Sequence, residues 1–292
     1  MDQQDWLAQQ FEQHRPHLRA VAYRMLGSLS EADDAVQDAW LRLSRVDADE
    51  IENLGGWLTT VVARLSLNML RSRNTRREQP LDVHVPDPVI DSADGTNPEH
   101  ETLLSDSVGL ALLVVLDTLS PAGRLAFVLH DMFAIPFAEI AAILERSPEA
   151  TRQLASRARR RVRGAPAPDP DVGAQWEVVD AFLAAARDGD FDRLVALLDP
   201  DVVLRADGGA VAALTQHVQG AEAVAGRARM WSRVDLSTRR ALVNGAAGMV
   251  TFRSGQPFSI AALTIRDGKI VEMNFLADPE RVARLDLEAL GD

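Results

Sequence analysis

Residues 136–163, PFAEIAAILERSPEATRQLASRARRRVR, carry the pattern of two short helices joined by a tight turn. Apolar side chains in the first half recur at intervals of three and four residues, the spacing of one buried helical face. Ser147 can cap the second helix, Pro148 suits its first turn, and Glu149 complements the positive end of the helix dipole. The sequence therefore predicts a helix-turn-helix whose second helix begins near Pro148.

The second of these helices is rich in arginine on the side away from its apolar positions. Ala150, Leu154, Ala158 and Val162 can face a core. The outward positions are then Arg152, Gln153, Ser156, Arg157, Arg159 and Arg160. Such side chains near a helix start can reach base edges in the major groove, and later arginines suit phosphates. A solvated basic helix is the alternative, but the partner helix and the scarcity of nearby acids favour DNA contact.

Composition limits what kind of protein this is. The chain has 292 residues, is 47% hydrophobic, and carries a net charge of −12, so two or three domains are expected and any DNA binding must come from local basic patches. Cysteine is absent, which excludes disulfides and thiolate chemistry. The N-terminus lacks a signal-peptide pattern, and the apolar run 108–116 is too short to cross a bilayer. We expect a cytoplasmic protein without a membrane partner.

The first block, residues 6–77, has helical periodicity in three stretches. Gly27 and Ser28 separate the first two, and the third starts near Gly56. The second stretch has an acidic face beside Trp40, which an ordinary solvated helix would also show. The third ends in polar and basic residues suited to phosphates and unpaired bases: Arg64, Asn68, Arg71, Arg73, Arg76 and Arg77. Arginine is also common at helix C-termini because it complements the dipole.

Residues 78–106 change character, with several prolines, many carboxylates and no Lys or Arg. This composition predicts an extended acidic linker. It is either a passive solvated tether or a flexible polyanion that mimics nucleic acid beside the two basic patches.

A Pro-rich run at 165–170 marks another domain boundary. Beyond it the pattern is helix, short helix and strand, followed by strand-like segments at 239–243, 247–253, 259–266 and 269–275. Turns are expected at Gly245, Gly255 and Asp267-Gly268. Helices followed by a meander predict an α+β cone.

These features together resemble the extracytoplasmic-function (ECF) sigma factors, the promoter-specificity subunits of bacterial RNA polymerase. DDAVQDAWLRL (33–43) resembles the surface that this family docks on the polymerase. GGWLTTVVARLSLNMLRSRNTRRE (55–78) resembles the helix that recognises and melts the minus-ten element, and the loop 46–55 would face a flipped base. The helix-turn-helix resembles the region-four domain that reads the minus-thirty-five element.

The resemblance implies a multidomain protein: an all-α region-two domain at 6–77, the linker at 78–106 and an all-α region-four domain at 107–164. It implies core RNA polymerase, through its beta-prime clamp helices and beta flap, and promoter DNA as partners. The implied polymerase contact is Asp34, Gln37, Asp38, Trp40 and Leu41, and the implied minus-ten contact is the basic set of the third stretch. The implied minus-thirty-five contact is Ser147, Arg152, Gln153, Ser156, Arg157 and Arg160.

Residues 172–277 resemble the SnoaL-like group of the NTF2-like fold, and the combination resembles SigJ-like sigma factors, in which this extension is thought to regulate the sigma core. Three marker motifs of that group appear in altered form as HVPDP (84–88), DGGAV (207–211) and DPERV (278–282). The implied regulatory contacts between domains are Pro86, Asp87, Pro88, Asp207, Gly208, Gly209, Asp278, Pro279, Glu280 and Arg281. We expect this domain to clamp the linker and one or both DNA-binding modules, and the tail 278–292 to form a regulatory helix.

Other functions stay open at this point. A DNA-binding regulator that is not a sigma subunit has no need of the DDAVQDAWLRL surface, and that surface therefore discriminates against it. A SnoaL-like enzyme on a DNA-binding platform would need a base and an oxyanion donor, yet the single tyrosine, Tyr23, lies in the first block. Asp207, His217, Trp231 and Asp235 could line a cavity, with an unidentified small ligand as a further partner. We expect no catalytic residue, metal or cofactor.

Overall fold

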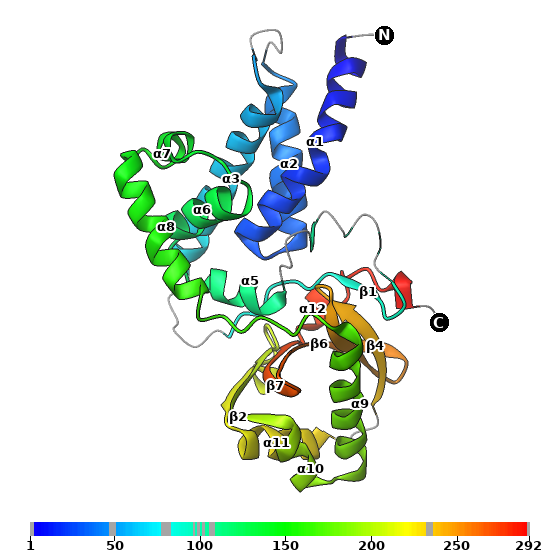
Figure 1. Ribbon diagram of the computed structural model, residues 1–292. Helices are drawn as coiled ribbons and strands as arrows, with labels where there is room; N and C mark the ends of the chain where they lie inside the picture. Colours follow the sequence, from blue (N-terminus) through cyan, green and yellow to red (C-terminus); the bar gives the residue numbers. More distant parts are fainter. Residues whose placement is uncertain are drawn as a thin grey trace. The chain divides into compact units, whose positions relative to one another are not determined.

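The computed structural model describes residues 3–46, 51–76, 83–95, 97, 100, 103–104, 109–231 and 236–290. The chain divides into two compact units (Figure 1). The first contains residues 1–80, 98–106 and 115–164, and the second contains residues 81–97, 107–114 and 165–292. The expected combination of helical domains with a C-terminal α+β domain is confirmed.

Three long helices form the N-terminal part of the first unit: α1 (Gln3–Leu26), α2 (Leu29–Leu43) and α3 (Leu54–Arg76). The predicted break after α1 is present. Gly27 has a φ of 66°, and the side chain of Ser28 accepts a hydrogen bond from Glu31 N at the start of α2. Leu18, Val21 and Met25 of α1 are fully buried against the other two helices.

The rest of the first unit holds α6 (Pro121–Phe127), a π-helical turn η2 (Val128–Met132), α7 (Phe137–Leu144) and α8 (Pro148–Val162). Helix α5 (Leu110–Asp117) precedes them, and its residues 110–114 belong to the second unit. The predicted helix-turn-helix is confirmed, with Glu145 in the left-handed region ending α7 and the Ser147 side chain accepting from Ala150 N. The predicted core face of α8 is shifted by one position in its first two turns, while Ala158 is buried as predicted. Its buried residues are Thr151, Ala155 and Ala158, whereas Ala150, Leu154 and Val162 are half-buried.

The second unit is a seven-stranded sheet packed against helices. Its elements are β1 (Ile90–Ser92), α9 (Val172–Asp188), α10 (Phe191–Leu197), β2 (Leu198–Asp207), η3 (Ala212–Leu214), β3 (Gln216–Gln219), α11 (Ala221–Trp231), β4 (Ser237–Val243), β5 (Ala246–Arg253), β6 (Gln256–Arg266), β7 (Lys269–Leu276), α12 (Pro279–Val282) and η4 (Glu288–Leu290). The strand order is β1-β4-β5-β6-β7-β2-β3, with β2 and β7 parallel and the other neighbours antiparallel.

The meander β4–β7 is set by its turns. Asn244-Gly245, Ser254-Gly255 and Asp267-Gly268 all have positive φ at both residues, the requirement of two-residue type I′ hairpins. The curved sheet packs one face on α9, α10 and α11 (Figure 1), where side chains such as Phe182, Leu194 and Val224 form the core with the strands. The predicted strands are confirmed, while β1, β3 and α11 are additional.

The largest correction concerns the linker. Residues 83–95 are neither a solvated tether nor a free polyanion, because they are built into the second unit. Val85 is 0% exposed, and the short strand β1 pairs with β4, placing Ile90 opposite Val243. The Val89 amide donates to Asn244 Oδ1 (3.1 Å). The apolar residues between the prolines therefore decide the position of this segment. Their burial against the sheet edge outweighs the preference of the acidic residues for water.

The tail also differs from its prediction. Instead of a single regulatory helix over 278–292, the chain forms the one-turn helix α12 and a 3₁₀ turn, η4, that contacts β1. Asp278 and Pro279 are a strong local helix start, but the apolar residues that follow are too sparse to bury a continuous face.

Candidate functional sites

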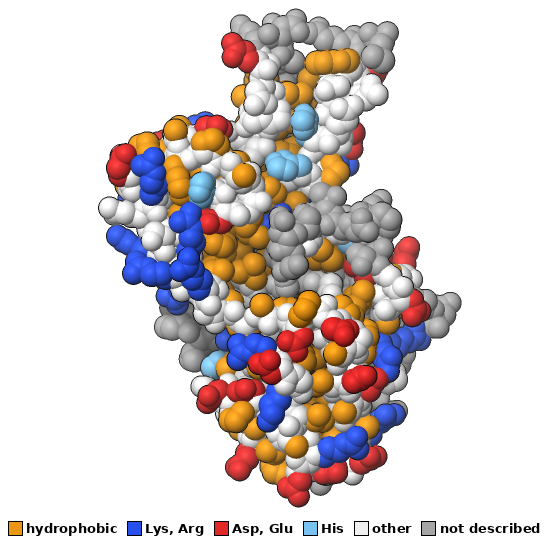
Figure 2. Space-filling model, viewed as in Figure 1, with side chains coloured by type: hydrophobic (Ala, Val, Ile, Leu, Met, Phe, Trp, Pro, Cys, Tyr) orange, Lys and Arg blue, Asp and Glu red, His pale blue; other side chains and the backbone are white. Residues whose placement is uncertain are grey.

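The second helix of the helix-turn-helix presents one continuous polar and basic surface. Gln153, Ser156, Arg157 and Arg160 are exposed on α8, as is Arg152, whose guanidinium lies 3.3 Å from Glu149. Arginine side chains gather over this helix in Figure 2. Arg159 is set apart from the exposed row because it is half-buried and its Nε donates to Asp131. The remaining row matches what a major-groove helix requires.

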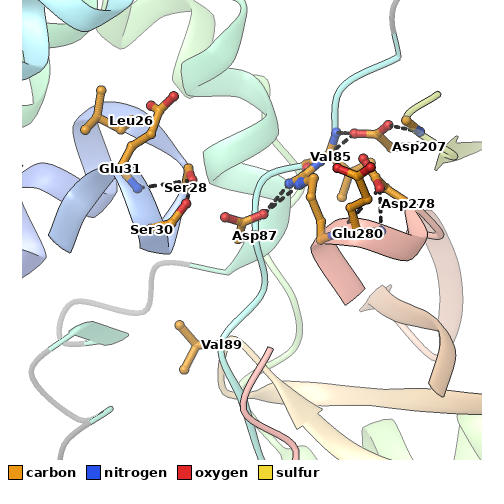
Figure 3. Close-up of polar contacts among 12 residues, drawn as sticks. Leu26, Ser28, Ser30, Glu31, Val85, Asp87, Val89, Asp207, Asp278 and Glu280 are labelled. Carbon is orange, nitrogen blue, oxygen red and sulfur yellow. Dashed lines mark hydrogen bonds and ion pairs between the residues drawn. The ribbon is translucent and has the colours of Figure 1, made fainter. Parts of the chain in front are cut away.

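The predicted DNA-contacting residues at the basic end of α3 do not all lie on one face of the helix. Arg64, Asn68 and Arg71 are exposed at positions i, i+4 and i+7, so they share one face. Arg73 does not belong to that face, which corrects the sequence expectation. Its guanidinium binds the carboxylate of Glu31 and donates to Leu26 O (2.9 Å), an orphan carbonyl at the end of α1 (Figure 3 shows Leu26 and Glu31).

The side chains of two further members of the predicted minus-ten contact are not described by the structure. The side chain of Arg76 and all of Arg77 lie outside the described residues, as do residues 47–50 of the loop 46–55.

The acidic surface of α2 combines charge with an apolar residue. Asp34, Gln37 and Asp38 are exposed, and Leu41 is 43% exposed beside them. Trp40 differs from the other predicted contacts because it is half-buried, with its ring 5.1 Å from that of Phe11. An exposed leucine bordered by carboxylates is a typical centre for a protein-protein contact.

Buried arginines, which the sequence reasoning missed, join parts of the first unit. Arg124 is 2% exposed, pairs with Asp117 and donates from Nε to Arg24 O (3.1 Å). Burial lowers the pKa of Arg124, and the neighbouring Asp117 carboxylate opposes that effect. The Arg24 guanidinium lies 4.7 Å from the centre of the Phe133 ring. An arginine inside the apolar stretch AGRLAFVL was the available signal, since a buried cation needs a partner.

His17 lies at the same junction, with its ring 5.2 Å from that of Phe133 in an edge-on arrangement. Burial is the main cause that lowers the pKa of His17, and the neighbouring His14 and Arg24 lower it further. The imidazole is therefore neutral at pH 7, which suits its aromatic surroundings.

Arg281 on α12 gathers several of the predicted regulatory residues into one cluster in the second unit. Figure 3 labels Val85, Asp87 and Asp207 of this cluster. Its Nη1 donates to Asp207 Oδ2 (2.8 Å), its Nε to Asp87 Oδ1 (2.8 Å), and its Nη2 to Val85 O (2.6 Å). The amide of Val85 donates in turn to Asp207 Oδ2 (3.0 Å). We call Arg281, Asp87, Asp207 and the main chain of Val85 the Arg281 cluster. It ties the linker to two segments of the second unit that are far apart in the sequence, the end of β2 and α12.

Two glycines make room for this cluster. Gly209 has a φ of 56°, and a Cβ there would lie 2.0 Å from Asp278 Oδ2, so only glycine fits. A Cβ on Gly208 would lie 2.5 Å from Leu214 Cβ. Asp278 caps α12 by accepting from Glu280 N (2.9 Å) and thereby sets the start of the helix that carries Arg281.

The other predicted members lie at the edge of the cluster. Pro86 and Pro88 are buried in the linker, whereas Pro279 and Glu280 are exposed. Glu280 faces Arg284 rather than the linker.

Residues 172–277, which we call the third domain, also contain a cavity of about 230 Å³. Its walls are largely apolar, including Phe182, Met249 and Phe275, with Arg187 and Arg227 as the charged lining residues. The sequence expectation for this cavity needs correction: Asp207 belongs to the Arg281 cluster, and His217 is exposed outside the lining. Asp235 and the Trp231 side chain lie outside the described residues.

Two further observations concern the described residues only. No helix among them is both long and apolar enough to cross a membrane. Within the same ranges, no three His, Asp or Glu side chains are grouped so that they could hold a metal ion.

Family comparisons match three segments of the chain. Residues 10–76 match Sigma-70 region 2, residues 109–162 match Sigma-70 region 4, and residues 179–273 match the SnoaL-like domain. The polar surfaces of α2 and α3 therefore lie in a region-two match, and α8 lies in a region-four match.

Several relatives match nearly the whole length of the chain. The chain is 40% identical over 289 residues to the ECF RNA polymerase sigma factor SigJ of Mycobacterium tuberculosis (93% of this chain, 92% of the relative). It is 35% identical over 298 residues to the probable ECF RNA polymerase sigma factor SigI of M. tuberculosis, covering both chains fully. The crystal structure of M. tuberculosis SigJ superposes with a TM-score of 0.76 at 37% identity, covering 96% of this chain and 99% of that one.

Proposed function

The chain belongs to the ECF RNA polymerase sigma factors, and we propose that its α2 surface binds the polymerase while α3 and α8 contact promoter DNA. A sigma factor binds core RNA polymerase and promoter DNA, and we propose which residues of this chain make these contacts and that they do so in the cytoplasm. The single observation that carries the assignment is the placement of one exposed acidic surface on α2 and two exposed basic surfaces on α3 and α8.

For the polymerase, we infer a contact centred on Leu41 with Asp34, Gln37 and Asp38 around it. An acidic rim would steer α2 toward a basic surface, such as that expected of the beta-prime clamp helices, and the leucine would supply desolvated contact area. Trp40 would act mainly by fixing α2 against α1, since its ring packs on Phe11. The beta flap remains the proposed partner of the region-four segment.

For the minus-ten element, we infer that Arg64, Asn68 and Arg71 contact DNA along one face of α3, with Arg76 and Arg77 beyond them. Arg73 is left out of this surface because Glu31 and the end of α1 occupy its guanidinium. For the minus-thirty-five element, Ser147, Arg152, Gln153, Ser156, Arg157 and Arg160 supply the α8 contacts.

Arg157→Ala tests the α8 assignment. Loss of one base-contacting arginine costs about 1–3 kcal/mol, so promoter affinity of the polymerase complex should fall about 5- to 150-fold. The measurement is an equilibrium binding titration at fixed salt on a promoter with a matched minus-thirty-five element. Arg163→Ala, another exposed arginine just after α8, is the control and should change affinity less than threefold. Equal losses in the two variants would contradict a specific role for Arg157.

We also infer that the third domain controls the sigma core in cis through the linker. The minus-ten and minus-thirty-five elements lie about 85 Å apart along B-form DNA, so the linker must let the two modules separate. Residues 83–95 could span about 45 Å if extended, but here they are held by β4 and by the Arg281 cluster. Holding this segment would limit the separation, and the free chain would bind promoters poorly.

A non-enzymatic role for the third domain is supported by the cavity. None of its described lining residues is a carboxylate or a histidine, so they supply no general base. Relatives with sigma-factor names support the same reading, although SnoaL-like domains occur in some enzymes.

Run-off transcription tests the whole proposal. Core polymerase with the full chain should give transcripts from a cognate promoter, and polymerase alone should give none. A truncated chain ending at Arg163 should bind the promoter more tightly than the full chain, because the linker is no longer held. Equal binding by the two chains would contradict control in cis, while specific DNA binding without any transcript would favour an ordinary DNA-binding regulator.

A further inference from the structure

The cavity of the third domain is large enough for an organic molecule. It lies between the sheet and the helices α9 and α11, and its volume is about 230 Å³. Apolar cavities of about 150 Å³ bind benzene. Scaling by volume, this cavity would enclose an apolar body of about nine or ten carbon atoms.

One wall of the cavity carries a row of hydroxyl groups. Thr238 on β4 lies opposite Thr251 on β5, and Thr251 lies opposite Ser259 on β6, so all three share one face of the sheet. Thr251 and Ser259 are buried. Among the described residues, nothing forms a side-chain hydrogen bond with any of these hydroxyls. Buried hydroxyls normally have partners, so this row is suited to a polar group on a bound molecule.

The charge around the cavity has one sign. Arg187 on α9 and Arg227 on α11 line it with exposed side chains, and the described lining includes no Asp or Glu. Within the described part of the chain, the Arg227 guanidinium has no carboxylate partner. In a protein of net charge −12, two arginines at one opening whose described lining contains no carboxylate mark a local site for an anion.

We propose that this cavity binds a small organic anion: an aromatic or branched apolar body with a single carboxylate. The apolar body fills the space between Phe182, Met249 and Phe275, the hydroxyl row accepts or donates hydrogen bonds along one wall, and the carboxylate faces the arginines. This inference does not depend on the sigma activity, and it can be tested without polymerase or promoter.

The test is a calorimetric titration of the full chain with 2-naphthoate and with its neutral analogue 2-naphthamide. We expect 2-naphthoate to bind with a dissociation constant of about 0.1 mM, as the ligand efficiency of a molecule of this size allows. The neutral amide should bind about tenfold more weakly, because it fills the same space without the charge-assisted contact.

Two variants locate the site. Ala228→Phe places a ring in the cavity and should abolish binding of both compounds. The double variant Arg187→Gln, Arg227→Gln should weaken 2-naphthoate about tenfold while leaving 2-naphthamide unchanged, so that amide binding also reports a folded cavity. Arg193→Gln, an exposed arginine on α10 outside the lining, is the control and should change neither affinity.

The outcomes that overturn the proposal are distinct. No heat of binding for either compound would exclude this ligand class. Equal affinities for 2-naphthoate and 2-naphthamide would contradict the proposal that the ligand is an anion. An unchanged affinity for 2-naphthoate in the double-arginine variant would contradict it as well. Binding that survives Ala228→Phe would place the ligand elsewhere on the chain.

Discussion

Arg281→Met is expected to lower the free energy of unfolding of the full chain by about 3–5 kcal/mol, because it removes the guanidinium that binds two largely buried carboxylates. The side chains of Asp87 and Asp207 are 10% and 8% exposed, so water can replace little of the lost contact. Val85 O also loses its donor. The measurement is urea unfolding at pH 7.

The matched control is Arg284→Met on the next turn of the chain. Arg284 is 67% exposed and faces Glu280 across an i,i+4 pair, so its loss should cost at most about 0.5 kcal/mol. Arg281→Lys keeps the charge but cannot reach three acceptors at once, and its cost should lie between those of the two methionine variants. A cost for Arg281→Met no larger than that for Arg284→Met would contradict the Arg281 cluster.

Arg281→Met also tests whether the third domain controls transcription by the sigma domains of the same chain. If the linker is held by the Arg281 cluster, Arg281→Met should loosen residues 83–95 and change run-off transcription, whereas Arg284→Met should not. Hydrogen exchange of the Val85 and Val89 amides, which donate to Asp207 and Asn244, measures the loosening directly. Faster exchange with unaltered transcription would leave the cluster intact as a structural feature but contradict its regulatory role.

Leu41→Asp is expected to weaken binding to core RNA polymerase by at least about 30-fold. A central apolar contact of an interface is worth about 2 kcal/mol or more, and a buried carboxylate there adds a desolvation cost. The substitution is tolerated by the fold because Leu41 is exposed on α2. The measurement is a fluorescence titration of labelled chain with core polymerase in the absence of DNA.

Met230→Asp serves as the control for the added charge. Met230 is also a large exposed apolar side chain, at 63%, but it lies on α11 of the third domain. It should leave polymerase affinity unchanged within about twofold. Comparable losses for both variants would indicate a general effect of surface charge and would contradict an α2 contact centred on Leu41.

Short-range patterns predicted much of the fold and the exposed surfaces. The helix-turn-helix followed from Ser147, Pro148 and the apolar spacing around them, because caps and periodicity act within one or two turns. The meander followed in the same way from turn residues such as Asp267-Gly268, since only a few residue types adopt positive φ there. The outward arginines of α8 followed from the helical repeat once the helix was placed.

Several functional assignments needed the tertiary structure. Arg73 and Arg71 look alike in the sequence, yet Arg73 binds Glu31 from another helix while Arg71 lies exposed on the outer face. Arg159 similarly leaves the exposed row for Asp131. Nothing within a few residues of either arginine reports its partner, because these pairs join segments distant in the chain.

By itself the sequence determined the helical sigma-type modules, the recognition helix and the α+β class of the third domain, because caps, turns and periodicity are local interactions. The fate of the linker was decided only by the tertiary structure. The acidic, proline-rich composition of residues 83–95 predicts a solvated tether. In the structure, Ile90 pairs with the edge of β4, and the Arg281 guanidinium neutralises Asp87. A segment's own composition gives its preference for water, and only the fold supplies the partners that outweigh that preference.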